Sequence, residues 1–325
     1  MGIKHLNKFF KEKAGDSIKF ISLSGLSGKK IAIDISIYMY KYASEGTLIE
    51  NIYLMLSIFR HYNIIPIFIF DGKPPMEKKE LLQKRRQDKK EAEEEFNKLK
   101  NILSYNLGID EAEKHDIINT MDMLKRRFVN IRKNDIENVK ELIRAYGATY
   151  YDAPGEADEL CAMLTIKDKV WACLSEDMDM FVYGCPRVIR YLSLLNHTAV
   201  IYDTKEILEN LGISQKELRE ICVLSGTDYN SLHDESKKSP TLYSTLKYFK
   251  KYYKEKSNLG FYDWLANNTN YIEDHENLKN IYNIFDLNGN RHFDVKIFEN
   301  IKISNGPILK DNIITILKTD GFMFC

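Results

Sequence analysis

Short apolar runs without polar alternation recur along the chain, and several of them end abruptly at an acidic residue. Three predicted strands of this kind are residues 30–33, 64–70 and 170–174. Runs of this length are typical of strands buried on both faces, as in a parallel sheet. They stop at Asp34, at Asp71 and at an acidic segment that contains Asp177. Because the functional crevice of an open α/β sheet lies beyond the carboxyl ends of its strands, these carboxylates are expected to meet in one cleft.

Helical spacing and turn residues fill the intervals between these strands. A short amphipathic helix is expected around Leu6, Phe9 and Phe10, followed by a Gly/Ser-rich connection to residue 30. After Asp34 the apolar spacing predicts helical packing, with an interruption near Glu45-Gly46. Further strands are expected at 148–151, 188–194 and 199–202, and further helices from residues 204 and 214. The predicted fold class is α/β, with a central, mostly parallel sheet flanked by helices.

The composition changes sharply after Met76, where basic residues and then glutamates crowd a segment of strong helix formers. The basic residues are Lys78, Lys79, Lys84, Arg85, Arg86, Lys89 and Lys90. A solvated helix laced with ion pairs is the ordinary interpretation of such a run. Its position directly after the strand that ends at Asp71 instead favours phosphate binding. A second basic patch, from Lys125 through Arg126 and Arg127 to Lys133, is expected to open the helix that runs to Tyr146.

The composition of the 325-residue chain limits what it can be. With 44% hydrophobic residues it can bury a large core, as one domain or as a domain with an appendage. Its 47 basic and 47 acidic residues cancel, so any affinity for nucleic acid must come from a local basic surface. Five cysteines without a Cys-x-x-Cys pair argue against a disulfide framework or a zinc site. No secretory signal or membrane span is recognisable, so a soluble, intracellular protein is expected, in the nucleus or the cytoplasm.

Seven acids are expected at the rim of the predicted sheet. They are Asp34, Asp71, Glu156, Asp158, Asp177, Asp179 and Asp228. Taken alone, Glu156 and Asp158 could serve a helix dipole, and Asp228 could be a turn residue. Gathered in one cleft, however, seven like charges would raise one another's pKa values and repel unless cations neutralise them. All-oxygen ligands favour Mg²⁺ or Mn²⁺ over zinc, and two such ions about 3.5–4 Å apart can hydrolyse a phosphodiester.

Six ordered motifs then identify a relationship. They are Met1-Gly2-Ile3, Ile31-Ala32-Ile33-Asp34, Phe70-Asp71-Gly72-Lys73-Pro74-Pro75, Ala153-Pro154-Gly155-Glu156-Ala157-Asp158, Ser175-Glu176-Asp177-Met178-Asp179 and Gly226-Thr227-Asp228-Tyr229. In this order and spacing the sequence resembles the flap endonuclease family of structure-specific 5′ nucleases, which have a PIN-like α/β core. The resemblance covers about the first 230 residues. The abundance of Asn, Lys, Ile and Tyr is typical of an AT-rich coding genome, as in a virus or a parasite.

The resemblance implies a role for each matching residue. Asp34, Asp71, Glu156 and Asp158 would serve one Mg²⁺ (or Mn²⁺), and Asp177, Asp179 and Asp228 a second, directly or through water. Lys78 and Arg85 match basic residues of the family's helical arch that steer and polarise the scissile phosphate. Tyr40 matches an aromatic residue on which a nucleobase stacks, and Gly2, freed of Met1, would lie against the substrate. Further DNA contacts are expected from Lys84, Arg86, Arg126 and Arg127.

The implied organisation is a PIN-like nuclease core over residues 1–230, with a helical arch at 76–134, and a C-terminal helical region over 231–325. The family's substrates are branched DNAs with a free 5′ end threaded under the arch. Asp158 departs from the family, which usually has Glu there. The segment after Tyr229 lacks the Gly-Ile-Gly hairpin that grips duplex DNA and K⁺, so its helix-turn-helix element is degenerate. No tail for binding a sliding clamp is recognisable near Cys325, and a monomer is expected.

The predicted function is a Mg²⁺-dependent 5′ flap endonuclease and 5′ to 3′ exonuclease acting in DNA replication, repair or recombination. A module that binds branched DNA without cutting it is one alternative, but a pure binder gains nothing from seven mutually repelling acids. A PIN-like ribonuclease is a second alternative. A preference for gaps or for long duplex ends is also left open by the altered loop after Tyr229.

Overall fold

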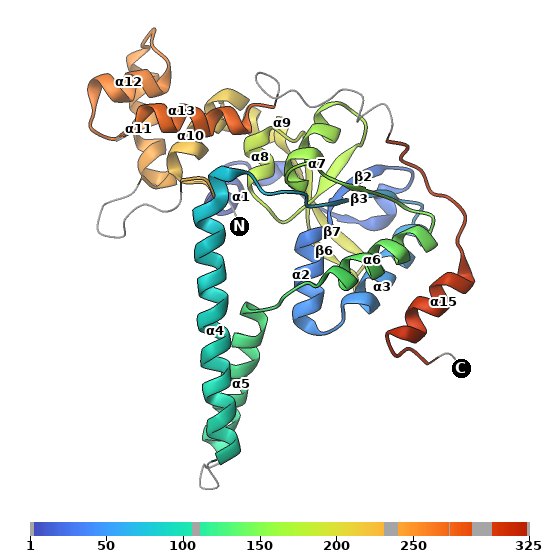
Figure 1. The fold of residues 1–325 in the computed structure, drawn as a ribbon. Coiled ribbons are helices and arrows are strands. Elements are labelled where there is room, and N and C mark those ends of the chain that lie inside the picture. The colour runs from blue at the N-terminus through green and yellow to red at the C-terminus, as the bar shows by residue number, and fades with distance from the viewer. Residues whose placement is uncertain (1–2, 106–110, 231–239, 273, 288–300, 324–325) are drawn as a thin grey trace.

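The computed structural model describes residues 3–105, 111–230, 240–272, 274–287 and 301–323. Its strands are β1 (Ile18–Ser22), β2 (Lys30–Asp34), β3 (Ile65–Phe70), β4 (Thr149–Asp152), β5 (Ala172–Leu174), β6 (Arg187–Ser193) and β7 (Thr198–Asp203). They form one seven-stranded sheet in the order β1-β7-β6-β5-β2-β3-β4. Neighbours from β6 to β4 are parallel, and β7 pairs antiparallel with β1 and β6. The predicted α/β class with a mostly parallel sheet is confirmed (Figure 1).

The two faces of the sheet explain why its central strands carry no polar alternation. Ala32, Ile67 and Ile69 face one hydrophobic cluster. Ile33 and Phe68 face the other. Because both faces are buried, the apolar run needs no polar partner residues.

Helices cover both faces. On the first face lie α1 (Leu6–Lys13), α7 (Ala157–Ile166), α8 (Asp179–Tyr183), α9 (Thr204–Leu211) and α10 (Gln215–Ser225). On the second face lie α2 (Ile35–Glu45), α3 (Leu48–His61), α6 (Lys133–Ala145) and α15 (Lys310–Thr319). The predicted interruption is present, because α2 ends at Gly46 with a left-handed φ of 74°. None of the described helices combines the length and the apolarity that a membrane span requires.

Strand β1 was not predicted from the sequence, which suggested only a Gly/Ser-rich connection there. Its residues neither alternate nor form an apolar run, and Phe20 in its centre is 74% exposed. The strand exists because it pairs with β7, whose residues lie far along the chain. Local pattern does not carry such a long-range pairing.

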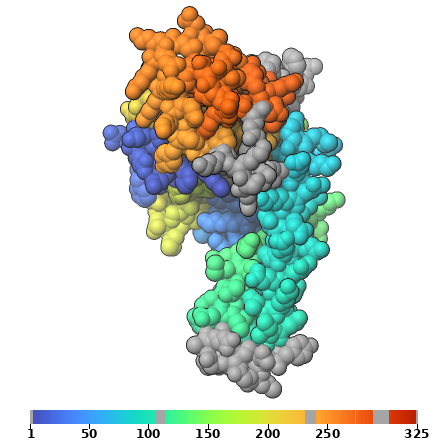
Figure 2. Space-filling model, turned by 90° about the vertical axis from the view of Figure 1, so that its left-hand side faces the viewer, coloured from blue at the N-terminus to red at the C-terminus, as the bar shows by residue number. Residues whose placement is uncertain are grey.

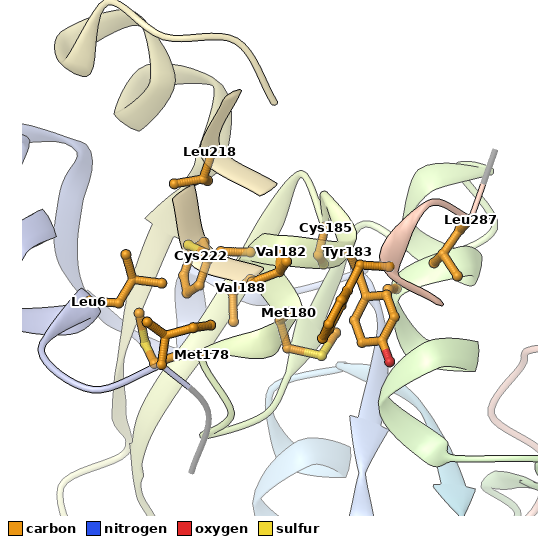
Figure 3. Packing of buried hydrophobic residues seen from close by; sticks show 14 of the residues in the cluster. Leu6, Met178, Met180, Val182, Tyr183, Cys185, Val188, Leu218, Cys222 and Leu287 are labelled. Carbon is orange, nitrogen blue, oxygen red and sulfur yellow. The ribbon is translucent and has the colours of Figure 1, made fainter. Parts of the chain in front are cut away.

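Helices α11 (Leu242–Glu255), α12 (Phe261–Asn268) and α13 (His275–Phe285) extend the first hydrophobic cluster beyond the sheet. Figure 3 shows Leu218 and Cys222 of α10 in the same cluster as Met180 and Tyr183 of α8. The Phe285 ring at the end of α13 lies 4.8 Å from that of Tyr183, between centroids. The division at residue 230 stays a prediction, and the described C-terminal helices share a core with the sheet.

Helices α4 (Lys79–Tyr105) and α5 (Glu111–Arg127) form a long hairpin that projects from the body (Figures 1 and 2). The long charged helix predicted after Met76 is therefore present as α4. The two helices pack through small and apolar residues: Ala92 is buried, and the rings of Phe96 and Phe128 lie 5.3 Å apart. The sequence predicts that the second basic patch opens α6, and this prediction is wrong. The patch is split between the last turn of α5 and the start of α6, because the chain turns back to the body at residues 128–132.

The free edge of β4 is covered by an extended segment at residues 301–309. Thr149 Oγ1 donates a hydrogen bond to the Lys302 carbonyl oxygen, and Gly306 N donates to Gly147 O over 2.7 Å. Gly147 has a φ of +68°, and a side chain there would meet the backbone of Gly306. A glycine is therefore needed where this segment crosses the chain just before β4.

We expect Phe285→Ala to lower the free energy of unfolding of the whole chain by about 3–5 kcal/mol, because the ring is fully buried in the shared core. Chemical denaturation followed by circular dichroism measures this change. Phe20→Ala removes the same ring from an exposed position and should cost no more than about 0.5 kcal/mol. Equal effects of the two substitutions would contradict a core shared by the sheet and α13.

Candidate functional site

The seven predicted acids all lie at the carboxyl edge of the parallel strands. Asp34 is the last residue of β2, and Asp71 directly follows β3. Glu156 and Asp158 stand at the start of α7, Asp177 and Asp179 follow β5, and Asp228 follows α10. Because β5, β2 and β3 are adjacent and parallel, their ends bring these groups to one side of the sheet.

Burial and mutual repulsion raise the pKa values of the central carboxyl groups. Burial raises the pKa of Asp34 to about 8, and the charges of Asp71 and Asp177 add to the effect. Burial also raises the pKa of Asp179, with Asp177 and then Asp228 contributing. These groups interact across several elements, so the cluster predicted from the sequence is present as a single electrostatic unit.

The loop after β5 forms hydrogen bonds with two of the acids. Ser175 Oγ donates to Asp34 Oδ2 over 3.3 Å and accepts a hydrogen bond from Asp177 N over 3.2 Å. Asp177 Oδ1 in turn accepts from Asp179 N over 3.0 Å. Asp179 is 1% exposed, yet its Oδ1 has no hydrogen-bond partner in the described part of the chain. An unpaired buried carboxylate oxygen is costly, and a cation is a partner that would satisfy it.

Two of the motifs interlock at Asp71. Its Oδ1 accepts a hydrogen bond of 2.9 Å from Ala157 N, at the amino end of α7. The next residue, Gly72, donates from N to Gly155 O over 2.7 Å. A side chain at Gly72 would overlap the carbonyl oxygen of Ala153, so only glycine fits this close approach. The contact fixes the end of β3 against the start of α7 and so sets the spacing of their acids.

Lys78 lies among the acids as a buried cation. It is 6% exposed, and its Nζ lies 2.8 Å from Glu156 Oε1 and 2.7 Å from Oε2. Tyr229 donates its hydroxyl hydrogen to the same Oε2 over 2.8 Å. Burial alone would lower the pKa of Lys78, but Asp158 and Glu156 raise it above the ordinary value. Lys78 therefore stays charged, and its charge in turn opposes the rise that burial causes in the pKa of Asp158.

Arg85, the second predicted basic residue of the arch, pairs with Asp228. Its Nη2 lies 2.7 Å from Asp228 Oδ2. Two predicted metal ligands, Glu156 and Asp228, are thus engaged by cations of the chain itself. As the described side chains stand, no group of three or more His, Cys, Asp or Glu residues is arranged so that it could hold a metal ion. The oxygen-only chemistry of the cluster and the unpaired Asp179 oxygen nevertheless fit a hard divalent cation.

The described residues among the predicted DNA contacts come from α2, α4 and α5. Tyr40 on α2 is 47% exposed, and Lys89 Nζ lies 4.9 Å from its ring centroid. The Lys89 ammonium also donates to Val129 O over 3.0 Å, which ties α4 to the chain that leaves α5. Lys84, Arg86, Arg126 and Arg127 are exposed, the first two on α4 and the last two in the final turn of α5. Gly2 and residues 231–239, the segment predicted to be a degenerate DNA-gripping element, lie outside the described residues.

Arg190 supports the acidic loop and was not singled out from the sequence. It is buried, its Nη2 donates to Glu176 O over 2.9 Å, and its Nη1 lies 2.8 Å from Met178 Sδ. Its guanidinium also lies 5.6 Å from the Tyr202 ring centroid. The available signal was a single arginine inside the apolar stretch at 188–192, since a lone charge in a buried strand needs a partner.

Comparison with known proteins identifies sequence relatives of this chain. The XPG N-terminal domain matches residues 1–92, and the XPG I-region matches residues 147–228. Flap endonuclease 1 of Trypanosoma brucei gambiense is 33% identical over 251 residues, and that of Lodderomyces elongisporus is 31% identical over 248. Each of these alignments covers 70% of this chain and 61% of the relative.

A solved structure supports the fold as a whole. The catalytic core of Rad2 in complex with DNA substrate superposes with a TM-score of 0.64, covering 98% of this chain and 94% of that one at 20% identity. The likeness confirms the predicted PIN-like fold and extends through the C-terminal helices. The chain spans about three fifths of the curated relatives it matches (61%), with both XPG regions in order. The two XPG regions together match more than half of the chain, and with these sequence relatives they show that the chain belongs to the flap endonuclease family.

Proposed function

We propose that this chain is a structure-specific 5′ nuclease that hydrolyses DNA phosphodiesters at 5′ flaps and 5′ ends, in replication, repair or recombination. The observation that carries the proposal is the cluster of carboxylates at the sheet edge with Lys78 and Arg85 among them. Buried like charges are costly, so a cluster of this kind is retained where it has a chemical task. The relatives named flap endonuclease 1, and the DNA substrate bound by the Rad2 core, support DNA as the substrate.

Two Mg²⁺ ions are the proposed cofactors, with Mn²⁺ as a substitute. Asp34, Asp71, Glu156 and Asp158 would hold one, and Asp177, Asp179 and Asp228 the other, directly or through water. When bound, such ions supply Lewis acidity at the scissile phosphate and lower the pKa of the attacking water. Lys78 and Arg85 compete with them for Glu156 and Asp228, because each cation already pairs with one of these acids.

Lys78 and Arg85 have a second partner available in the substrate. Both project from the start of the hairpin into the acidic cluster, where a phosphate that approaches meets two fixed cations. An ammonium or guanidinium that exchanges a carboxylate for a phosphate oxygen keeps a charge-assisted hydrogen bond. These two residues are therefore proposed to orient the scissile phosphate and to stabilise its developing charge.

The remaining predicted contacts form the proposed DNA interface. Tyr40 offers an exposed ring for stacking, and Gly2 would lie against the substrate. Lys84, Arg86, Arg126 and Arg127 offer solvent-exposed charges to the phosphate backbone. The proposed partner is a branched DNA with a free 5′ end, bound by a monomer. The alternative of binding without cleavage is disfavoured, because DNA binding alone would be served better by a less acidic surface.

Asp177→Ala should reduce the rate of cleavage of a 5′-flap duplex at least about a thousandfold, because it removes a ligand of the proposed cation pair. Gel-shift affinity for the same DNA in Ca²⁺ should change little. Asp168→Asn is the matched control, since this exposed acid has a left-handed φ of 52° that asparagine also adopts. Full activity of Asp177→Ala would refute the nuclease assignment of this site.

Lys78→Met and Arg85→Ala should each lower the single-turnover rate on a 5′-flap duplex about a hundredfold, since each removes a cation at the phosphate. Lys90→Ala serves as the control, because Lys90 is exposed on α4 and, among the described residues, pairs with Glu94 and not with an acid of the cluster. Quench-flow cleavage at saturating enzyme gives the rates. An unchanged rate in both variants would remove these residues from the mechanism.

The metal-free chain should lose stability as the pH rises from 3.8 towards about 8, the ordinary and the raised pKa of Asp34. The folded state binds this proton more tightly than the unfolded state, so its ionisation destabilises the fold. Asp34→Asn should flatten this part of the pH profile and raise the melting temperature in EDTA at pH 8. It should also shrink the gain that Mg²⁺ gives to the unmodified chain. A variant with the same profile and the same Mg²⁺ response as the unmodified chain would contradict the role of Asp34.

A further inference from the structure

A backbone bulge in β6 presents the Tyr191 side chain to the solvent. The pairing of β6 with β7 shifts its register between Arg190 and Ser193, and Tyr191, inside this bulge, has a left-handed φ of 54°. This conformation is costly for a bulky residue and persists only where neighbouring contacts fix it. Bulges of this kind re-aim a side chain and are frequent next to active sites. Tyr191 is 42% exposed, so the strained backbone holds an aromatic side chain where a ligand can reach it.

The bulge adjoins the acidic loop that follows β5. Strand β6 is the parallel neighbour of β5, so both strands end at the edge of the sheet where the acids gather. Tyr191 N donates a hydrogen bond of 2.6 Å to Glu176 Oε1, and Glu176 directly precedes Asp177 in the chain. Neighbouring strands lie about 5 Å apart. A ligand on Tyr191 would therefore be a close neighbour of a group held by the carboxylates, on the β6 side of the cluster.

Hydrogen bonds from α1 hold the Tyr191 hydroxyl in place. Asn7 Nδ2 donates to Tyr191 Oη over 2.7 Å, and Tyr202 Oη donates to Asn7 Oδ1 over 2.8 Å. Because the Tyr191 hydroxyl oxygen accepts the Asn7 hydrogen, its own hydrogen is not used in that bond and can be donated to a ligand. A tyrosine hydroxyl is one of the side-chain groups that bind phosphate oxygens of nucleic acids.

Two cations flank the Tyr191 ring, and they differ in their availability. Lys11 Nζ lies 5.2 Å from the ring centroid, and the Arg190 guanidinium carbon lies 4.9 Å from it. Arg190 is buried, and its Nε lies 3.6 Å from Glu176 Oε2, so its charge is balanced inside the chain. Lys11 is exposed on α1 and forms no ion pair with a described residue. Its ammonium group is therefore available to an anion.

The groups around Tyr191 match a phosphate better than a nucleobase. A base that stacked on this ring would compete with the two cations that already contact it. A phosphate instead gains a charged donor from Lys11 and a neutral donor from the Tyr191 hydroxyl, while the cations keep their contact with the ring. Since the site lies one strand away from the carboxylates, the phosphate that fits it belongs to the backbone of a nucleic acid held at the cluster.

We propose that Lys11 and Tyr191 bind one backbone phosphate of the DNA duplex beside the cleavage site, with Asn7 and the β6 bulge positioning the Tyr191 hydroxyl. The inference rests on the proposed function and adds a binding site to it, on the β6 side of the carboxylates. A phosphate held there contributes to affinity and to the placement of the duplex. It takes no part in the chemical step, so its loss weakens DNA binding more than it slows cleavage by saturating enzyme.

The first test measures how salt affects binding of a 5′-flap duplex by the full chain carrying Asp177→Asn, in Ca²⁺, by fluorescence anisotropy. Adding Lys11→Ala should weaken binding about fivefold and lower the slope of log affinity against log salt by about 0.9, because one phosphate contact is lost. Lys13→Ala is the matched control. Lys13 is equally exposed on α1 but, among the described residues, does not lie over the Tyr191 ring. This control should keep the slope and bind within about twofold of the parent.

The second test locates the phosphate, by replacing single phosphates near the cleavage site with uncharged methylphosphonates. One such replacement should weaken binding by the parent about fivefold but binding by Lys11→Ala less than about twofold, because the charged partner is already missing. Tyr191→Phe keeps the ring and removes the hydroxyl, so it should reduce the penalty at the same phosphate. A purely structural role of Lys11 would weaken binding without coupling it to any single phosphate.

The outcomes separate this site from the proposed function. An unchanged salt slope for Lys11→Ala, or equal methylphosphonate penalties in Lys11→Ala and the parent, would overturn the phosphate site while the chain still binds and cuts 5′ flaps. With Asp177 restored, Lys11→Ala at saturating enzyme should cleave within about threefold of the unmodified rate, because the carboxylates are untouched. A chain that neither binds nor cuts 5′-flap DNA refutes the proposed function itself.

Discussion

Repulsion among buried carboxylates at the end of a parallel sheet is the constraint on which the rest of this structure depends. Asp34, Asp177 and Asp179 are nearly inaccessible to water, and each raises the cost of ionising its neighbours. The chain offsets part of this cost with cations of its own, because Lys78 pairs with Glu156 and Arg85 with Asp228. Lys78 directly precedes α4 and Arg85 lies on it, so these two ion pairs also fix where α4 starts relative to the cluster.

The fold holds the buried carboxylates close together because packing and hydrogen bonds fix the backbone around them. Both faces of the sheet are packed, Gly72 locks the end of β3 against the start of α7, and Arg190 holds the loop after β5. The C-terminal helices reinforce the same region, since the Phe285 ring lies 5.4 Å from that of Tyr229, whose hydroxyl binds Glu156. Stability is concentrated around groups that by themselves are destabilising, which is a common feature of catalytic sites.

What could be predicted from the sequence was local or periodic. Apolar runs that stop at Asp34 and Asp71 predict buried strands. Gly46, which has a left-handed φ, ends a helix where the apolar pattern breaks. The grouping of the acids followed because parallel strands share one edge. Strand β1 depends instead on its pairing with β7, far along the chain. No window of the sequence contains both halves of such contacts, so only the folded structure reveals them.

The central claim is that these carboxylates gather to hold a pair of hard divalent cations. Anomalous diffraction from crystals of the full chain soaked in Mn²⁺ tests it most directly, because each bound ion appears as a peak whose position needs no assumption about activity. The account predicts two peaks about 3.5–4 Å apart, bounded by the seven acids, with Glu156 and Asp228 released from Lys78 and Arg85. Crystals that show no peak among these side chains, or Mn²⁺ bound only elsewhere on the surface, would contradict it.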